Sequence, residues 1–326
     1  MTRKTKDLLN SLITDRTEEE IWQAVSAGGH TQLSPYNRFK KAVSVEIGVP
    51  YETVYRMVYD DYLVRYYLEK GGTLMDGKLP TRLDAERREI ELRTGELLTY
   101  DYLIAADGAN SWVGHQLGLT FGGKLFCLEI NVSREDFDYE DIGIYFDVIG
   151  VGYAWVFPKN DLYCIGIGST EKPKKDTKAI FSDFLQRIGV RNLEKYPFQG
   201  AFVPGGGFLK KPVFGERMLF VGDAAGFADP LTGEGLYWSM YSGIQAAEAI
   251  SAAYGKKMGN GLGKDSTVSM KHAEAAPSLY APKGHVDYRQ MASAQADANA
   301  EVNANACACA KAKAKAARGR LKLMEI

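Results

Sequence analysis

The stretch from Arg217 to Tyr254, RMLFVGDAAGFADPLTGEGLYWSMYSGIQAAEAISAAY, constrains the fold more than any other part of the chain. Its short apolar run 218–221 is typical of a strand that is covered on both faces. The run ends at Gly222-Asp223, and small residues then lead into a helix that we expect to begin near Gly235. The unpaired N–H groups of a helix start, preceded by residues without bulk, favour a flat or anionic ligand. The alternative is an ordinary strand–loop–helix unit with a glycine-rich loop.

This stretch resembles the flavin-binding motif of FAD-dependent oxidoreductases built like aromatic hydroxylases, and most of all that of the geranylgeranyl reductase group. The resemblance implies that Asp223 holds a hydroxyl of the FAD sugar or ribityl chain. It also implies that the amides of 232–235 lie against the N1/C2=O edge of the flavin, where a helix N-terminus stabilises the negative charge of the reduced ring. The cofactor-binding residues predicted here are Gly222, Asp223, Ala224, Pro230, Thr232, Gly233, Glu234 and Gly235.

A second segment of this kind comes earlier in the chain. The apolar run 102–106 predicts a buried strand that ends in the turn Asp107-Gly108-Ala109-Asn110-Ser111. Such turns are common without any function, but this one resembles the second flavin motif of the family. The resemblance implies that Asp107 and Gly108 contact the cofactor and that Ser111 caps the following helix. Aromatic hydroxylases usually carry Arg three residues after this serine, and Gly114 in that place argues against a close hydroxylase relationship and leaves the reductase branch open.

The segment 53–70 predicts a helix that ends at Gly71-Gly72. By itself it is typical of a surface helix with a face of Tyr and Leu residues. It also resembles the family segment R-x-x-F-D-x-x-L, here 56–63 with Tyr59 in place of Phe. The resemblance implies that Arg56 lies near the FAD.

Successive short apolar runs with tight turns predict an antiparallel sheet between 121 and 170. Within it, the sequence GYAWVFPK at 152–159, followed by Gly-Ile-Gly at 166–168, resembles the Y-x-W-x-F-P motif of geranylgeranyl reductases. The period-2 spacing places Tyr153, Trp155 and Phe157 on one face of a strand. That face either packs in the core or lines the cavity for an isoprenoid substrate, and both can hold together. The expected strands are 125–132, 142–149, 153–157, 163–168 and 198–203, and a helix is expected at 177–188.

Residues 1–50 depart from the family pattern. The capping box 17–20 predicts a short helix that ends at Gly28-Gly29, and 42–47 predicts a strand. No G-x-G-x-x-G follows a strand in this chain, although resembling families open with that fingerprint, whose helix start binds the FAD pyrophosphate. Without that first strand, two strands of the parallel sheet lose a shared neighbour. We therefore expect either that residues 1–50 build a substitute for this strand and its helix or that the chain is a fragment or aberrant gene product. We also expect that FAD binding by the isolated chain is weak or absent.

The composition limits the kinds of protein that this chain can be. The chain has 326 residues, of which 45% are hydrophobic and 25% charged, which is typical of a globular protein. A net charge of −1 gives no electrostatic case for nucleic acid, and no apolar run is long enough to span a bilayer. Four cysteines do not make a disulfide framework or a metal site, and we expect Cys127 and Cys164 to be buried thiols. A cytoplasmic protein is expected, with peripheral membrane contact implied only by a lipid substrate.

The predicted fold class is α/β, an incomplete Rossmann-like FAD-binding domain with an antiparallel-sheet substrate domain. Alanine alternates with small polar residues over 291–318, which predicts a disordered or marginally helical tail. The expected domains are a partial FAD-binding domain at 1–120, a substrate domain at 121–205, the continued FAD-binding domain at 206–255 and a low-complexity tail at 256–326.

The resemblance implies FAD as the cofactor and reduction of C=C bonds in an isoprenoid or similar lipid by hydride transfer from the reduced flavin. NADPH is the expected reductant of the flavin, and ferredoxin is the alternative. One alternative is a flavin monooxygenase or halogenase-like enzyme that acts on an aromatic substrate. Another is a non-catalytic, truncated flavoprotein. No side chain in the sequence identifies itself as the catalytic proton donor, and neither a metal nor an oligomeric state is indicated.

Overall fold

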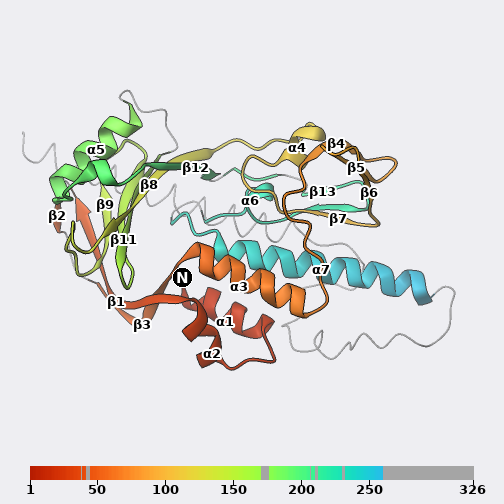
Figure 1. Cartoon of the computed structure of the whole chain (residues 1–326), viewed down its shortest axis with the longest axis horizontal. Coiled ribbons are helices and arrows are strands. Elements are labelled where there is room, and N and C mark those ends of the chain that lie inside the picture. Colours follow the sequence, from red (N-terminus) through yellow and green to blue (C-terminus); the bar gives the residue numbers. More distant parts are fainter. Residues whose placement is uncertain are drawn as a thin grey trace, which may run out of the picture. The chain divides into compact units, whose positions relative to one another are not determined.

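The computed structural model describes residues 1–37, 39–41, 45–169, 176–205, 207–209, 212–229 and 232–259. The chain forms two compact units (Figure 1). The first combines 1–100 with 123–205, and the second combines 101–122 with the residues from 206 onward. The domain boundaries predicted from the sequence stay a prediction, and the predicted site residue Pro230 and almost all of the predicted tail lie outside the described residues.

A large sheet organises the first unit. In the described part of the chain its order is β12-β8-β11-β10-β9-β1-β2, and β3 also pairs with β1. All neighbours are antiparallel except β1 and β9, which run parallel. The predicted antiparallel sheet is therefore confirmed. Its strands are β1 (Ser26–Asn37), β2 (Lys40–Lys41), β3 (Val45–Val54), β8 (Lys124–Ser133), β9 (Ile142–Phe146), β10 (Gly152–Pro158), β11 (Leu162–Ser169) and β12 (Gln199–Pro204).

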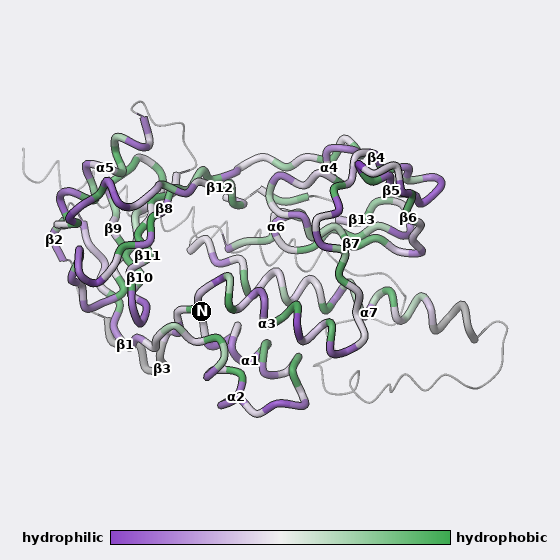
Figure 2. Tube along the Cα trace, viewed as in Figure 1, coloured by the Kyte–Doolittle hydropathy of each residue, from purple (hydrophilic) through white to green (hydrophobic). Residues whose placement is uncertain are grey.

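The core of this unit lies between one face of the sheet and helix α5 (Thr177–Ile188). The helix begins and ends where the sequence predicts, because Asp176 caps its start and Gly189 adopts the left-handed conformation at its end. Figure 2 shows the apolar stretches of the strands that it covers. The fully buried side chains at this contact include Ile130, Val156, Ile165, Ile167, Phe181 and Phe184.

Three helices and a small sheet complete the described part of the first unit. The predicted capping box is present, since the side chains of Thr17 and Glu20 each bond the other's backbone N–H. The helix ends at Val25, however, and not at Gly28-Gly29, because these glycines lie in β1, where Gly28 sits at an irregularity with a φ of 133°. The elements are α1 (Arg3–Leu12), α2 (Glu18–Val25), α3 (Arg56–Glu69), a hairpin-linked sheet of β4 (Pro80–Asp84), β5 (Glu89–Leu92) and β6 (Leu97–Thr99), and the 3-10 turn η1 (Leu193–Lys195).

The second unit contains a short sheet whose described strands follow the order β13-β14-β7. Strand β14 is buried throughout, as predicted. Strand β7 is less buried than predicted, since Ile104 is 38% exposed and only Ala105 is buried. The pair β14 and β7 is parallel, and with the helices it confirms the α/β class. The elements are β7 (Leu103–Ala105), α4 (Trp112–Gln116), β13 (Val213–Phe214), β14 (Met218–Phe220), α6 (Gly222–Ala225) and α7 (Leu236–Gly259).

Candidate functional site

The two flavin-type motifs follow neighbouring strands. In the parallel pair, Phe220 of β14 lies opposite Ala105 of β7, and the Val221 N–H donates to the Ala105 carbonyl at 3.0 Å. The turns that begin two residues later at Asp107 and Gly222 therefore leave the same edge of the sheet. Ligands of open α/β sheets bind beyond the carboxyl ends of the strands, and this is such an edge.

The turn after β14 is fixed to helix α7. The backbone N–H of Gly222 donates to Ser242 Oγ at 2.9 Å, and that hydroxyl in turn donates to the Trp238 carbonyl at 2.7 Å. Gly222 has a φ of 52°, and a Cβ added to it would lie 2.8 Å from Ser239 Oγ. A glycine is required at this position, and the buried Ser242 holds it in place.

The Asp223 carboxylate lies against the beginning of α7. A Cβ added to Gly235 would stand 3.2 Å from Asp223 Oδ1, so a side chain there would crowd the carboxylate. The structure thus brings together Asp223 and Gly235, which the sequence predicts to share a site. The first N–H groups of α7 have no partner within the helix and give this end a positive partial charge.

The loop before α7 uses its own polar groups. Asp229 Oδ1 accepts from the Thr232 N–H at 2.7 Å and from its hydroxyl at 2.9 Å. The Gly233 N–H donates to the Asp229 carbonyl at 2.8 Å, and the Glu234 N–H donates to Thr232 Oγ1 at 3.2 Å. The amides of 232–234 are therefore bonded inside the loop, and their predicted contact with a flavin stays a prediction.

The turn after β7 is held in a similar way. Asp107 Oδ2 accepts from the Val113 N–H at 3.0 Å, and Gly108 has a φ of 80°. Ser111 Oγ accepts from the Gly114 N–H at 2.9 Å, which confirms the predicted cap of α4. A Cβ on Gly114 would lie 3.0 Å from the Leu119 carbonyl, so the backbone leaves little room for the arginine that hydroxylases carry there.

Arg56 lies in the other compact unit, at the start of α3. Its Nε and Nη2 donate to the two carboxylate oxygens of Asp60 at 3.2 and 3.1 Å, and its side chain is 63% exposed. The predicted contact between Arg56 and FAD stays a prediction.

The three aromatic residues of β10 share one face, as predicted. The rings of Tyr153 and Trp155 are 5.9 Å apart, and those of Trp155 and Phe157 are 6.1 Å apart and stacked. They do not pack in the core, because Ala154 and Val156 point to α5 and the ring-bearing positions alternate with them. The rings are half-buried and form what we call the aromatic face of the sheet. Their lining of a substrate cavity stays a prediction.

The cysteines of the sheet lie on this same face. Cys164 is buried, as predicted, whereas Cys127 is only half-buried. Burial raises the pKa of the Cys127 thiol to about 11 and that of Cys164 to about 12, with the charge of Glu129 as a second cause in each. Both thiols are therefore protonated near neutral pH and are poor nucleophiles.

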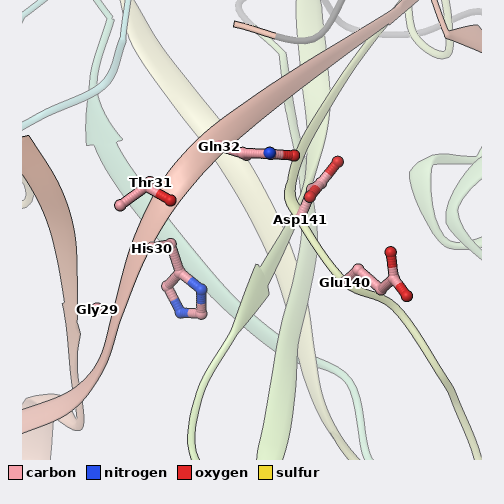
Figure 3. A pocket seen from close by; sticks show the side chains of 6 residues that line it. All are labelled: Gly29, His30, Thr31, Gln32, Glu140 and Asp141. Carbon is pink, nitrogen blue, oxygen red and sulfur yellow. The ribbon is translucent and has the colours of Figure 1, made fainter. Parts of the chain in front are cut away.

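A separate polar pocket of about 220 Å³ lies beside β1 (Figure 3). His30 lines it, and its Nε2 lies 2.9 Å from the Pro158 carbonyl. Burial lowers the pKa of His30, so its ring is neutral at pH 7. Asp141 at the rim accepts from Ser34 Oγ at 2.5 Å and from Lys41 Nζ at 2.9 Å. None of the predicted site residues lines this pocket, and the described residues contain no group of His, Cys, Asp and Glu able to hold a metal ion.

Comparison with known proteins identifies the protein family to which the chain belongs. Residues 80–274 match the FAD-binding domain family, and the chain belongs to this family of flavoproteins. It is 33% identical to an uncharacterized protein of Methanosarcina barkeri, over 61% of this chain and 52% of that protein. It is 27% identical to digeranylgeranylglycerophospholipid reductase 1 of Methanosphaera stadtmanae, over 72% of this chain and 61% of the relative. The chain thus spans about half to three fifths of the length of these relatives.

Solved structures agree on the fold. A geranylgeranyl bacteriochlorophyll reductase-like protein from Thermoplasma acidophilum superposes with a TM-score of 0.65 at 21% identity, covering 77% of this chain and 67% of the other. The halogenase PltM in complex with phloroglucinol and FAD gives 0.62 at 17% identity, covering 78% and 62%. At such identities the likeness shows the fold alone. Together with the sequence relatives, it confirms the predicted resemblance to the geranylgeranyl reductase group of FAD-dependent oxidoreductases.

Among the described helices, none is long and apolar enough to cross a membrane.

The sequence did not lead to a prediction for Ser242, which anchors the Gly222 turn. The signal for it was a serine in a helix otherwise rich in apolar and small residues, spaced four residues from Trp238, whose carbonyl its hydroxyl bonds.

Proposed function

We propose that this protein is an FAD-dependent oxidoreductase that reduces C=C bonds of an isoprenoid or similar lipid substrate. The observation that carries the proposal is the shared carboxyl edge of β7 and β14, where the Asp107 and Asp223 turns leave adjacent parallel strands. The start of α7 lies against Asp223 at the same edge. The digeranylgeranylglycerophospholipid reductases among the relatives support a lipid with isoprenoid chains as the substrate.

In this proposal the carboxylates of Asp107 and Asp223 accept hydrogen bonds from hydroxyl groups of the FAD. The positive end of α7 stabilises negative charge on the isoalloxazine ring, because the helix amides there point out of the helix. Bound FAD supplies the hydride, and the protein supplies position and electrostatics. The turn glycines Gly108 and Gly222, with Ala224, let the cofactor approach the backbone. Thr232, Gly233, Glu234 and Gly235 shape the helix start, and Arg56 and Pro230 complete the proposed set.

The aromatic face of β10 would receive the lipid chain. Tyr153, Trp155 and Phe157 present half-buried rings in one row, and an apolar chain laid on them would remove both surfaces from water. Binding of a membrane lipid would also bring the protein to a membrane surface. NADPH is the proposed source of electrons.

The test uses purified protein incubated with FAD, a reductant and a polyprenyl lipid. We expect flavin-dependent gain of two hydrogens per reduced bond by mass spectrometry, with NADPH compared against dithionite. Asp223→Asn should weaken FAD binding about tenfold or more, since hydrogen bonds to a charged group contribute about 1.5–3 kcal/mol. The exposed Asp183→Asn on α5 is the matched control and should bind FAD like the wild type.

Other outcomes would point elsewhere. Oxygen uptake stimulated by an aromatic substrate, without reduction of the lipid, would favour the flavin monooxygenase or halogenase-like alternative. A protein that folds but binds no flavin would favour the non-catalytic alternative.

A further inference from the structure

One end of the large sheet, where β8 begins and β11 ends, carries four exposed apolar side chains. Among the described residues of 123–205, these four are all of the large apolar side chains that are exposed, with between 37% and 56% of their surface open to solvent. They come from β8, β9, β12 and the loop before β10, and we call them the apolar rim: Phe126, Phe146, Val151 and Phe202.

The register of the strands places these side chains along one end of the sheet. Phe202 of β12 lies opposite Phe126 of β8, and their rings are 5.3 Å apart. Phe126 also lies opposite Ser169, the last residue of β11. Ser169 in turn lies opposite Gly152, and its hydroxyl donates to the Val151 carbonyl at 2.9 Å. The hydrogen bond holds the loop before β10 beside the strand end, so the rim crosses several strands.

The apolar rim continues into the aromatic face. The ring of Phe146, the last residue of β9, lies 6.5 Å from the ring of Tyr153. Trp155 and Phe157 follow along β10 at ring separations of 5.9 and 6.1 Å. A row of rings therefore leads from the exposed end of the sheet along the face to which the proposed function assigns the lipid chain.

Charge contributes little at this end of the sheet. Lys124 and Asp147 are the charged residues within two positions of a rim residue, and their signs are opposite. Attraction to a charged partner is therefore weak, and the hydrophobic effect is the force that would bring a partner to the rim.

The size of the apolar rim favours a lipid surface over a protein partner. A fully buried aromatic side chain covers about 150–250 Å², so the exposed parts of the four side chains together offer about 300–400 Å². A stable protein–protein interface needs about 800 Å² from each partner. A bilayer sets no such threshold, because its affinity for a protein scales with the apolar area that is inserted.

We propose that the apolar rim docks on the surface of a lipid bilayer. The four side chains enter the boundary between headgroups and acyl chains, and the aromatic face begins beside them at Tyr153. A lipid chain would then pass from the bilayer directly onto the row of rings. This last step rests on the proposed function, whereas docking itself requires only the rim.

The experiment mixes the purified chain with vesicles of phosphatidylcholine and measures the bound fraction by sedimentation. We expect the wild type to bind, and addition of phosphatidylglycerol or of about 0.5 M NaCl to change the partition coefficient less than about threefold. The double variant Phe126→Ser/Phe202→Ser should lower this coefficient at least about tenfold, because two insertable rings are lost. Leu97→Ser is the matched control, since Leu97 on β6 is equally exposed but lies outside the rim, and it should change binding less than about twofold.

A second variant separates docking from a folding defect, because it is expected to gain binding. Val151→Trp adds an interfacial aromatic side chain to the exposed loop and should raise the partition coefficient about threefold or more. Its added tryptophan emission should shift to shorter wavelength with vesicles. Leu97→Trp should show neither effect.

Each remaining outcome bears on a different statement. A wild type that does not bind vesicles overturns the docking, and so does equal binding by the wild type and the double variant. Self-association that the double variant loses, without vesicle binding, would assign the rim to a second copy of the chain instead. Vesicle binding by a flavin-loaded protein that reduces no lipid leaves the docking standing and overturns the proposed function. Reduction of a detergent-dispersed lipid by a protein that binds no vesicles overturns the docking alone.

Discussion

Gly166→Ala tests how the aromatic face is built. The substitution adds one methyl group to β11 beneath the Trp155 indole. That Cβ would lie 2.1 Å from Trp155 Cζ2 and 2.8 Å from the Leu128 carbonyl of the neighbouring strand. Ordinary van der Waals contact begins at 3.4 Å, so the indole would have to rise by at least about 1.3 Å. Tyr153 and Phe157 lie on either side of the ring along the strand and limit its sliding.

The expected loss of stability follows from this overlap. Overpacking a fitted site costs about 1–3 kcal/mol, and contact with both a ring and a backbone carbonyl argues for the upper half of that range. Alanine restricts the unfolded chain more than glycine does, which offsets about 0.5–1 kcal/mol. We therefore expect the free energy of unfolding to fall by about 1–2.5 kcal/mol.

The test is a double-mutant cycle of G166A and W155A, with stability measured by urea denaturation. Far-UV circular dichroism follows the unfolding, because W155A removes a tryptophan and would change a fluorescence signal. In a double-mutant cycle, G166A should cost at least about 1 kcal/mol less in the W155A background, since only the contact with the Leu128 carbonyl remains. Gly243→Ala in α7 is the control, as no atom lies within 4 Å of its added Cβ. It should raise stability by about 0.5–1 kcal/mol. An equal cost of G166A with and without the indole would refute the placement of Trp155 over Gly166.

Three further substitutions test other parts of the structure. Ser242→Ala should lower the free energy of unfolding by about 1–3 kcal/mol in denaturation assays, because it leaves the buried Gly222 N–H without its acceptor. Thr17→Ala should cost about 1 kcal/mol by the same measurement, since it removes the cap of α2, and Thr17→Ser should retain most of the stability. Hydrogen bonds from the Ser34 hydroxyl and then from Lys41 Nζ hold the pKa of Asp141 below its usual value. The contribution of the ionised Asp141 carboxylate to the free energy of unfolding is therefore complete above about pH 4, the ordinary pKa of an aspartate, and is lost as pH falls through the lowered pKa. Asp141→Asn should therefore flatten the acid side of a plot of the free energy of unfolding against pH.

Elements with a complete local signal were predictable from the sequence. Helix α5 has an aspartate cap, apolar residues at 180, 181, 184 and 185, and a closing glycine, and it begins and ends where these signals place it. The sequence also predicts the hairpin of β5 and β6, because Thr94-Gly95 separates the two short runs 89–93 and 96–99, and Gly95 adopts the positive φ that such a turn needs.

Features set by distant partners were not predictable in the same way. Strand β1 is largely polar and contains Gly28-Gly29, so its local signals favoured a helix end, but these glycines pair with Thr53 and Glu52 of β3, which gives them an extended conformation. The spacing of Tyr153 and Trp155 shows that they share a face, but the choice of face is made by α5, which covers the other one.

The pairing of β7 with β14 changes what the absent G-x-G-x-x-G implies. The strands of the two motifs need no intervening neighbour, because Val221 donates directly to Ala105. The edge that carries Asp107 and Asp223 is therefore formed without the fingerprint strand, and this edge is the part that we propose for the ribityl and flavin groups. The pyrophosphate would lack the helix start that usually binds it.

A flavin edge without the glycine fingerprint predicts that the chain binds riboflavin nearly as well as FAD. Riboflavin contains the ribityl chain and the ring but no pyrophosphate, so it should bind this chain with a Kd within about tenfold of that for FAD, a difference of about 1.4 kcal/mol or less. Quenching of flavin fluorescence measures both constants, and Asp223→Asn should weaken both ligands to the same degree. If FAD bound more than about a hundredfold tighter than riboflavin, the chain would have to contain a pyrophosphate site other than the glycine fingerprint, and the reasoning would fail.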